Sequence, residues 1–190
     1  KVKSLFRNNG CTDYMLSLKP LIQNNVQNSP SKQELLKLYA QYEKIRKGEP
    51  APTPVLKDAQ GKEYSFKDFR GKVIVVDVWA TWCCVCLEKM PEFMQLRDEF
   101  ANNKNVLFLT VSIDRKNVRD KWLKTIELHH MNGMLNLMPD CDEQSAFETE
   151  YHIPSVPRHI IIDPEGKIVD AYAPMSLEKL KELIQNTLKQ

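Results

Sequence analysis

The chain has 190 residues, enough for one sizeable domain and an appendage. Its 42% hydrophobic and 27% charged residues are typical of a folded globular protein and argue against a disordered chain or a coiled coil. The formal net charge is only +2, and basic residues are interspersed with acidic ones, so we expect no nucleic-acid partner.

The longest apolar stretch, residues 73–80, is interrupted by Asp77 and is far shorter than the roughly 20 apolar residues that span a bilayer. The chain begins at Lys1, and the residues that follow lack the apolar core of a secretory signal. We therefore expect no membrane span in this chain. We also expect that an upstream segment has been removed, which would be a signal peptide, an anchor or another domain.

Residues 1–48 are predicted to form a helical appendage. Ser31 and Glu34 have the spacing of a capping box, and the helix that follows should end near Gly48. Its apolar residues recur at helical spacing: Leu35, Leu38, Tyr39, Tyr42 and Ile45. Three prolines in residues 49–54 then make a stiff connector, which places a domain boundary between residues 48 and 49.

The second domain, residues 49–190, is predicted to alternate strands and helices. A hairpin around Gly61, a buried strand over 73–79, a helix to about residue 103 and a strand over 106–113 come first. Helices are expected over 117–127 and 145–151, with 129–137 left undetermined. Strands over 158–163 and 167–173 precede a helix capped by Ser176. This order predicts an α/β fold with a central mixed sheet flanked by helices.

Five cysteines are an odd number, which argues against a scaffold held together by disulfides. Cys83, Cys84 and Cys86 lie together where the strand over 73–79 gives way to a helix. Clustering of three cysteines at one turn favours a reactive site over structural disulfides. Cys11 and Cys141 are predicted to be free, or to form a single structural bridge in an oxidising compartment.

The spacing of Cys83 and Cys86 at the first turn of a helix suits a reversible disulfide. The unsatisfied amides and the dipole of the helix favour an anion at Cys83, which predicts that Cys83 is the attacking thiolate. Cys86, one turn inside, would resolve the mixed disulfide. A structural zinc site is disfavoured because no second Cys-x-x-Cys or spaced His pair is present.

Three segments resemble the thioredoxin superfamily, and within it the TlpA/ResA-like envelope thiol-disulfide oxidoreductases. They are Gly71–Cys86 with Met90 and Pro91 just beyond, residues 153–157 (Ile-Pro-Ser-Val-Pro), and residues 159–167 (His-Ile-Ile-Ile-Asp-Pro-Glu-Gly-Lys). They follow in the family's order and spacing over roughly residues 48–190. The resemblance implies a thioredoxin-like fold for this part of the chain, and the predicted helical appendage precedes it.

The resemblance also implies roles for single residues. Cys83 and Cys86 match the nucleophile and the resolving thiol, and Trp82 matches the aromatic residue that flanks the active-site turn. Pro157 matches the cis-proline that faces the disulfide, and Val156 before it would offer backbone groups to an extended substrate. A cis bond is plausible there because only X-Pro bonds adopt it at small cost.

Asp77 matches the buried acid of thioredoxin that relays protons to the resolving cysteine. A carboxylate in an apolar strand is costly unless it is paired or protonated, so burial is expected to raise its pKa. The alternative is a carboxylate that reaches solvent or a backbone amide at the strand end.

Two positions depart from the family. Lys89 stands where an acid is frequent, with Glu88 before it, which puts acid-assisted chemistry from that position in doubt. Cys84 is a third thiol on the turn. It could trap a mixed disulfide, help to bind Cu(I), or simply be a small exposed side chain.

The sequence thus predicts an enzyme that exchanges protein disulfides, as a reductant in the periplasm of the bacterial cell envelope. Its partners would be protein disulfide substrates and an upstream electron donor, and no cofactor or metal is expected. One alternative is a peroxiredoxin-like thiol peroxidase, since Thr81 and Cys84 have the required spacing, although Asp77 replaces the expected proline. Another is a Cu(I)-binding thioredoxin-like module.

Overall fold

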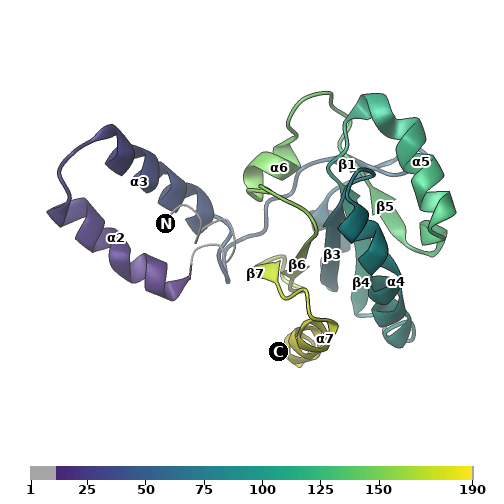
Figure 1. Ribbon diagram of the computed structural model, residues 1–190. Helices are drawn as coiled ribbons and strands as arrows, with labels where there is room; N and C mark the ends of the chain where they lie inside the picture. Colours follow the sequence, from purple (N-terminus) through teal and green to yellow (C-terminus); the bar gives the residue numbers. More distant parts are fainter. Residues whose placement is uncertain (1–11, 190) are drawn as a thin grey trace.

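A five-stranded mixed sheet forms the centre of the protein, seen in a computed structural model that describes residues 12–189 (Figure 1). Its strands are β3 (Val73–Trp79), β4 (Val106–Ser112), β5 (Leu135–Leu137), β6 (Arg158–Ile162) and β7 (Ile168–Ala173), in the spatial order β5-β4-β3-β6-β7. β3, β4 and β5 run parallel, whereas β6 and β7 pair antiparallel. Every residue of β3 is buried, as expected for a valine-rich central strand.

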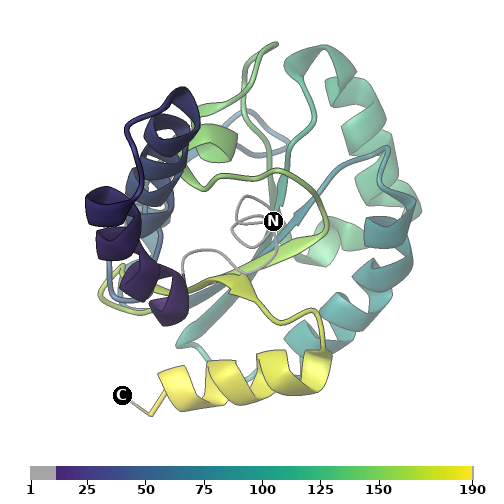
Figure 2. The same cartoon turned by 60° about the vertical axis from the view of Figure 1, so that its left-hand side comes forward.

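Helices cover both faces of the sheet, which confirms the predicted α/β class and the thioredoxin-like fold. α4 (Cys84–Glu99), α5 (Arg119–Leu128) and α7 (Leu177–Thr187) bury apolar side chains against one face, together with Val73, Val75 and Trp79 of β3. α6 (Ala146–Glu150) and the 3-10 helix Phe66–Phe69 pack on the other face. Figure 2 shows these two layers on opposite sides of the strands.

A short hairpin precedes the sheet, as predicted. β1 (Leu56–Lys57) pairs antiparallel with β2 (Glu63–Tyr64), and Gly61 between them has φ +84°. A positive φ costs glycine little because it has no Cβ. The backbone of Lys57 also bonds to Met138, which ties the hairpin to the segment after β5.

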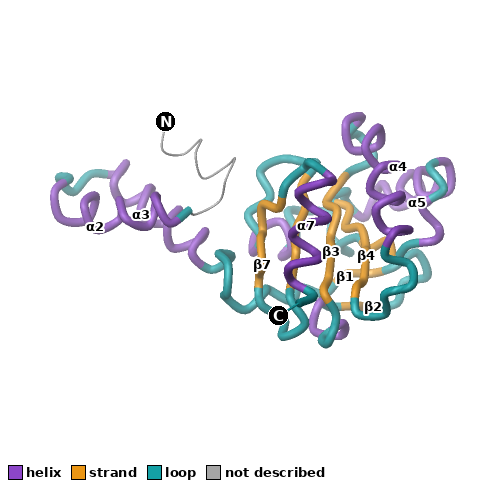
Figure 3. The backbone as a smooth tube through the Cα atoms, turned by 90° about the horizontal axis from the view of Figure 1, so that it is seen from below, coloured by secondary structure: helices purple, strands orange, loops and turns teal. Residues whose placement is uncertain are grey.

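Two helices, α2 (Asp13–Asn25) and α3 (Pro30–Glu43), form a hairpin beyond the β7 edge of the sheet (Figures 1 and 3). The Tyr39 hydroxyl donates to the Met15 carbonyl at 2.8 Å, which joins the two helices. Tyr42 stacks on His152 with ring centroids 4.8 Å apart. The appendage is therefore packed onto the sheet domain through an aromatic contact.

Helix ends differ from the sequence prediction in several places. α3 is capped by Ser29, whose side chain accepts from the Lys32 amide at 3.2 Å, and not by Ser31. Pro30 explains the earlier start, because proline suits the first position of a helix. α3 ends at Glu43 and α4 at Glu99, short of Gly48 and residue 103. Ser176 precedes α7, but its side chain makes no capping hydrogen bond.

The segment that the sequence left undetermined contributes the edge strand β5. Its residues Leu135–Leu137 pair in parallel with Leu109–Val111 of β4.

Among the described residues, no helix has both the length and the apolarity that crossing a bilayer requires.

Candidate active site

A disulfide joins Cys83 and Cys86 at the start of α4, just past the carboxyl end of β3. The two Cα atoms lie 5.3 Å apart, as the two-residue gap on a first helical turn predicts. Cys83 is the N-cap of α4, and its sulfur accepts the Cys86 amide hydrogen at 3.2 Å. The same amide is placed to stabilise a Cys83 thiolate after reduction.

The two sulfur-bearing residues differ in burial. Cys83 is 7% exposed and Cys86 is 1% exposed. Trp79 packs beneath them and is fully buried, whereas Trp82 projects outward and is 61% exposed. An attacking molecule therefore meets the Trp82 and Cys83 side of the turn before it meets Cys86.

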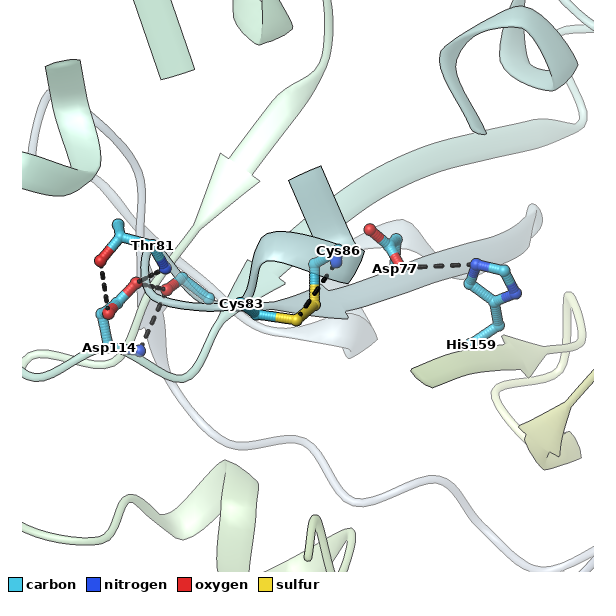
Figure 4. Close-up of a disulfide and its surroundings, with 7 residues drawn as sticks. Asp77, Thr81, Cys83, Cys86, Asp114 and His159 are labelled. Atoms are coloured by element: carbon cyan, nitrogen blue, oxygen red, sulfur yellow. Dashed lines mark hydrogen bonds and ion pairs between the residues drawn. A yellow bond between two sulfur atoms is a disulfide. The ribbon is translucent and has the colours of Figure 1, made fainter. Parts of the chain in front are cut away.

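Asp114, a residue that sequence reasoning missed, holds the active-site turn in place (Figure 4). It lies two residues beyond β4 and is 3% exposed. Its carboxylate accepts from the Thr81 amide at 2.8 Å, the Thr81 hydroxyl at 3.0 Å and the Ser112 hydroxyl at 2.6 Å. The turn before Cys83 is thus anchored by charge-assisted hydrogen bonds.

Replacing this carboxylate should destabilise the fold. In Asp114→Ala the buried amide and hydroxyl of Thr81 lose their acceptor, so we expect a loss of about 3 kcal/mol in the free energy of unfolding. Urea unfolding of the oxidised protein measures it. Asp114→Asn, which keeps one acceptor oxygen, should lose less, and a loss under about 0.5 kcal/mol in Asp114→Ala would contradict the anchoring role.

Cys84 is exposed and carries no disulfide. The peroxidase alternative requires Thr81 to serve this cysteine, but the Thr81 hydroxyl instead bonds to Asp114. Cys141 is also free of disulfides, while Cys11 lies outside the described residues. In residues 12–189, no group of three or more His, Cys, Asp and Glu side chains is arranged to hold a metal ion.

The loop before β6 lies next to the disulfide. The peptide bond between Val156 and Pro157 is cis, and both residues are half-buried. Pro157, Cys86 and Asp77 line a common narrow cavity of about 10 Å³, roughly the room that one water molecule needs. The structure thus brings together Cys83, Cys86, Asp77, Val156 and Pro157, with Trp82 at the outer rim.

Asp77 has a partner that the sequence analysis did not assign. It is 4% exposed on β3, and its Oδ1 lies 3.4 Å from Nε2 of His159, which is 3% exposed on β6 (Figure 4). The two residues are direct cross-strand neighbours. Nδ1 of His159 lies 3.0 Å from the Pro174 carbonyl. The sequence placed His159 in a predicted strand two residues past Pro157, but only the pairing of β6 with β3 sets it opposite Asp77.

Burial by itself would lower the pKa of His159, because it disfavours the charged imidazolium. The contact and charge of Asp77 and the Pro174 carbonyl outweigh burial and raise the pKa above the usual 6.5, while Lys89 opposes them. A raised pKa in the folded state means that protonation of His159 stabilises the fold.

This shift predicts how stability depends on pH. The contribution of His159 is complete below pH 6.5, the pKa of an unfolded histidine, and is lost as the pH rises through the higher folded-state pKa. The excess in free energy of unfolding of wild type over His159→Gln should therefore be largest at about pH 5.5 and should shrink as the pH is raised toward about 9. Urea unfolding across that range checks this, and a difference that grows with pH would contradict it.

Known proteins resemble this chain in sequence and in fold. Thioredoxin-like protein YneN of Bacillus subtilis is 29% identical over 152 residues, which cover 76% of this chain and 84% of that protein. Thiol-disulfide oxidoreductase ResA of Bacillus cereus is 26% identical over 152 residues, covering 80% of this chain and 82% of that protein. A candidate thiol-disulfide oxidoreductase of Bacteroides vulgatus, solved by crystallography, is 33% identical with a TM-score of 0.67, covering 76% of this chain and 98% of its own.

The family model described as the AhpC/TSA family matches residues 47–171, which include β3, the disulfide and the loop before β6. Resemblance to thiol-disulfide oxidoreductases, expected from the motifs, is confirmed by these relatives. The chain therefore belongs to the AhpC/TSA family and carries the Cys-x-x-Cys disulfide on its thioredoxin-like fold.

Proposed function

We propose that this protein reduces protein disulfides through the Cys83–Cys86 couple. The observation that carries the proposal is the disulfide at the amino end of α4, where the sulfur of Cys83 accepts the Cys86 amide hydrogen. Both the helix dipole and this amide favour a thiolate at Cys83 once the disulfide is reduced. A thiolate at neutral pH is the attacking species in disulfide exchange.

Exchange proceeds in two steps. The Cys83 thiolate attacks a substrate disulfide, forms a mixed disulfide and releases the first substrate sulfur as a thiolate. Cys86 then loses its proton and attacks Cys83, which releases the second substrate sulfur and leaves the Cys83–Cys86 disulfide. Asp77 is the proposed acceptor of the Cys86 proton, since both line the same small cavity and one water can bridge them.

The substrate's path is proposed to run over Trp82 and the Val156–Pro157 loop. Trp82 offers an exposed aromatic surface beside the attacking sulfur. A second cavity of about 320 Å³ begins at Pro157 and is bounded by Pro154, Ser155 and Tyr172. It has room for the side chain next to a substrate cysteine, while the backbone of Val156 pairs with the extended peptide.

A reductant must itself be reduced again, so we infer an upstream electron donor with its own dithiol. We further infer a location in the periplasm of the bacterial envelope, where exposed protein disulfides persist and need such an enzyme. Residues 49–190 are proposed to carry this activity, with residues 1–48 as a separate helical appendage.

Reduction of insulin by the protein in the presence of dithiothreitol tests the activity. We expect turbidity to develop faster with wild type than with Cys83→Ser, which lacks the attacking sulfur. The reduction potential of the couple tests the direction: a value near about −270 mV supports a reductant, and one near about −120 mV makes the protein an oxidant.

Cys83→Ser and Cys84→Ser together separate the competing functions. A thiol peroxidase acting through Cys84 would consume peroxide in Cys83→Ser and lose that activity in Cys84→Ser. A copper module would bind Cu(I) tightly in the reduced state without turning over insulin. Either result would replace the proposal.

A further inference from the structure

His159 is a buried titratable group in contact with the proposed proton acceptor. It reaches Asp77 from the neighbouring strand β6, and its ring stacks on Phe93 of α4 with centroids 5.5 Å apart. His159, Asp77 and Cys86 all line the same cavity of about 10 Å³. Figure 4 shows the imidazole on the far side of Asp77 from the disulfide.

We propose that His159 is a positioning residue for Asp77 and stores the proton that Asp77 takes from Cys86. This inference rests on the proposed disulfide exchange and deepens it. In place of a lone buried carboxylate, the base is a carboxylate–imidazole pair.

The hydrogen-bond pattern of His159 fits this role. Its Nδ1 faces the Pro174 carbonyl, which can only accept, so Nδ1 carries a hydrogen. Nε2 is left to face Asp77. With one added proton the pair is carboxylate and imidazolium, and a buried charge is then matched by an opposite charge at 3.4 Å. Without that proton the imidazole is neutral.

The proton and electrons balance in the resolving step. The Cys86 thiol passes its proton to Asp77, directly or through one water, and the pair holds it with Nε2 of His159 protonated. The Cys86 thiolate attacks the sulfur of Cys83, the Cys83–Cys86 bond forms, and the bond from Cys83 to the substrate breaks. The cysteine pair is oxidised, the substrate sulfur is reduced, and it leaves as a thiolate.

Other charged groups face this pair from α4. Lys89 and Glu92 line the same cavity, and Lys89 disfavours the protonated imidazole. From the α7 side the cavity is lined by Met175 and Leu177, which carry no charge. Among the described residues, Asp77 is the carboxylate with an oxygen within 4 Å of a His159 ring nitrogen, so its removal should change the pKa of His159 the most.

The test follows the resolving step by itself. Reduced protein is mixed with 5,5′-dithiobis(2-nitrobenzoate) in a background in which Cys11, Cys84 and Cys141 are serine. The first thionitrobenzoate is released when Cys83 attacks, and the second when Cys86 resolves the mixed disulfide. Stopped-flow absorbance gives both rates from pH 5 to 9.

The matched variant is His159→Gln, whose amide can still donate to Asp77 but cannot ionise at these pH values. In the parent background the rate of the second thionitrobenzoate release should rise with pH through a midpoint above 6.5 and then level off. In His159→Gln we expect the midpoint at least about one pH unit lower and a plateau about tenfold slower, because a weaker base accepts the proton. The first release should be unchanged.

Superimposed pH profiles of the two proteins would overturn the proposal, because His159 would then serve only as a hydrogen-bond donor. NMR of the imidazole ring gives an independent reading: the pKa of His159 should fall in Asp77→Asn, and an unchanged pKa would also overturn it. Failure of the proposed function is seen separately, as an absence of insulin reduction by wild type, and leaves the NMR titration measurable.

Discussion

Cys86→Ser is expected to abolish turnover while leaving the first chemical step intact. Cys83 can still attack a substrate disulfide, but no sulfur remains one turn inside the helix to release the product. We expect insulin reduction to fall by a factor on the order of 10³ or more, with accumulation of a covalent complex between the protein and its substrate. Non-reducing electrophoresis and mass spectrometry detect that complex.

Two controls make this result specific. Cys83→Ser should form no complex at all, because the attacking sulfur is gone. Cys84→Ser should behave as wild type, since Cys84 is exposed on the outer side of the turn and takes no part in the disulfide. If Cys86→Ser kept its activity and lost it only when Cys84 was also replaced, Cys84 would be the resolving thiol.

Asp77→Asn should slow the resolving step by about 100-fold at pH 7, because the buried acceptor for the Cys86 proton is removed without a change in shape. The attack by Cys83 should stay within about twofold of wild type, since its thiolate is stabilised by the helix end instead. Stopped-flow measurement of the two releases of thionitrobenzoate separates these steps.

Asp142→Asn is the matched control, because Asp142 is exposed and lies outside the site. It should leave both rates unchanged. Raising the pH should partly rescue Asp77→Asn, because solvent hydroxide then removes the Cys86 proton. An equal slowing of both steps would instead indicate that Asp77 supports the structure of the site and not proton transfer.

Local signals in the sequence were sufficient to predict most of the helices and strands. The valine-rich run of β3 and the Cys-x-x-Cys motif at its end predicted the strand, the turn and the helix that carry the disulfide. The hairpin around Gly61 was equally clear, because a single residue with positive φ marks the turn. These features depend on residues close together in the chain.

Elements with weak local sequence signals were missed, or their ends were predicted at the wrong residue. β5 has only three residues, too few to show an alternating pattern, and exists because its backbone pairs with β4. The start of α3 was predicted wrongly, because the spacing of Ser31 and Glu34 suggested a cap at Ser31. The helix instead begins at Pro30 and is capped by Ser29.

The sequence by itself determined the fold class, because the order of strand and helix patterns is read along the chain. It also determined the redox motif and the position of the buried acid, because each lies in a short, contiguous run of residues. Only the tertiary structure decided what surrounds them. His159 is 82 residues from Asp77 in the chain and Asp114 is 33 residues from Thr81, and strand pairing brings each of these pairs together. A contact at such a separation leaves no local periodicity, so the charge partner of Asp77 and the anchor of the active-site turn emerged only from the packed sheet.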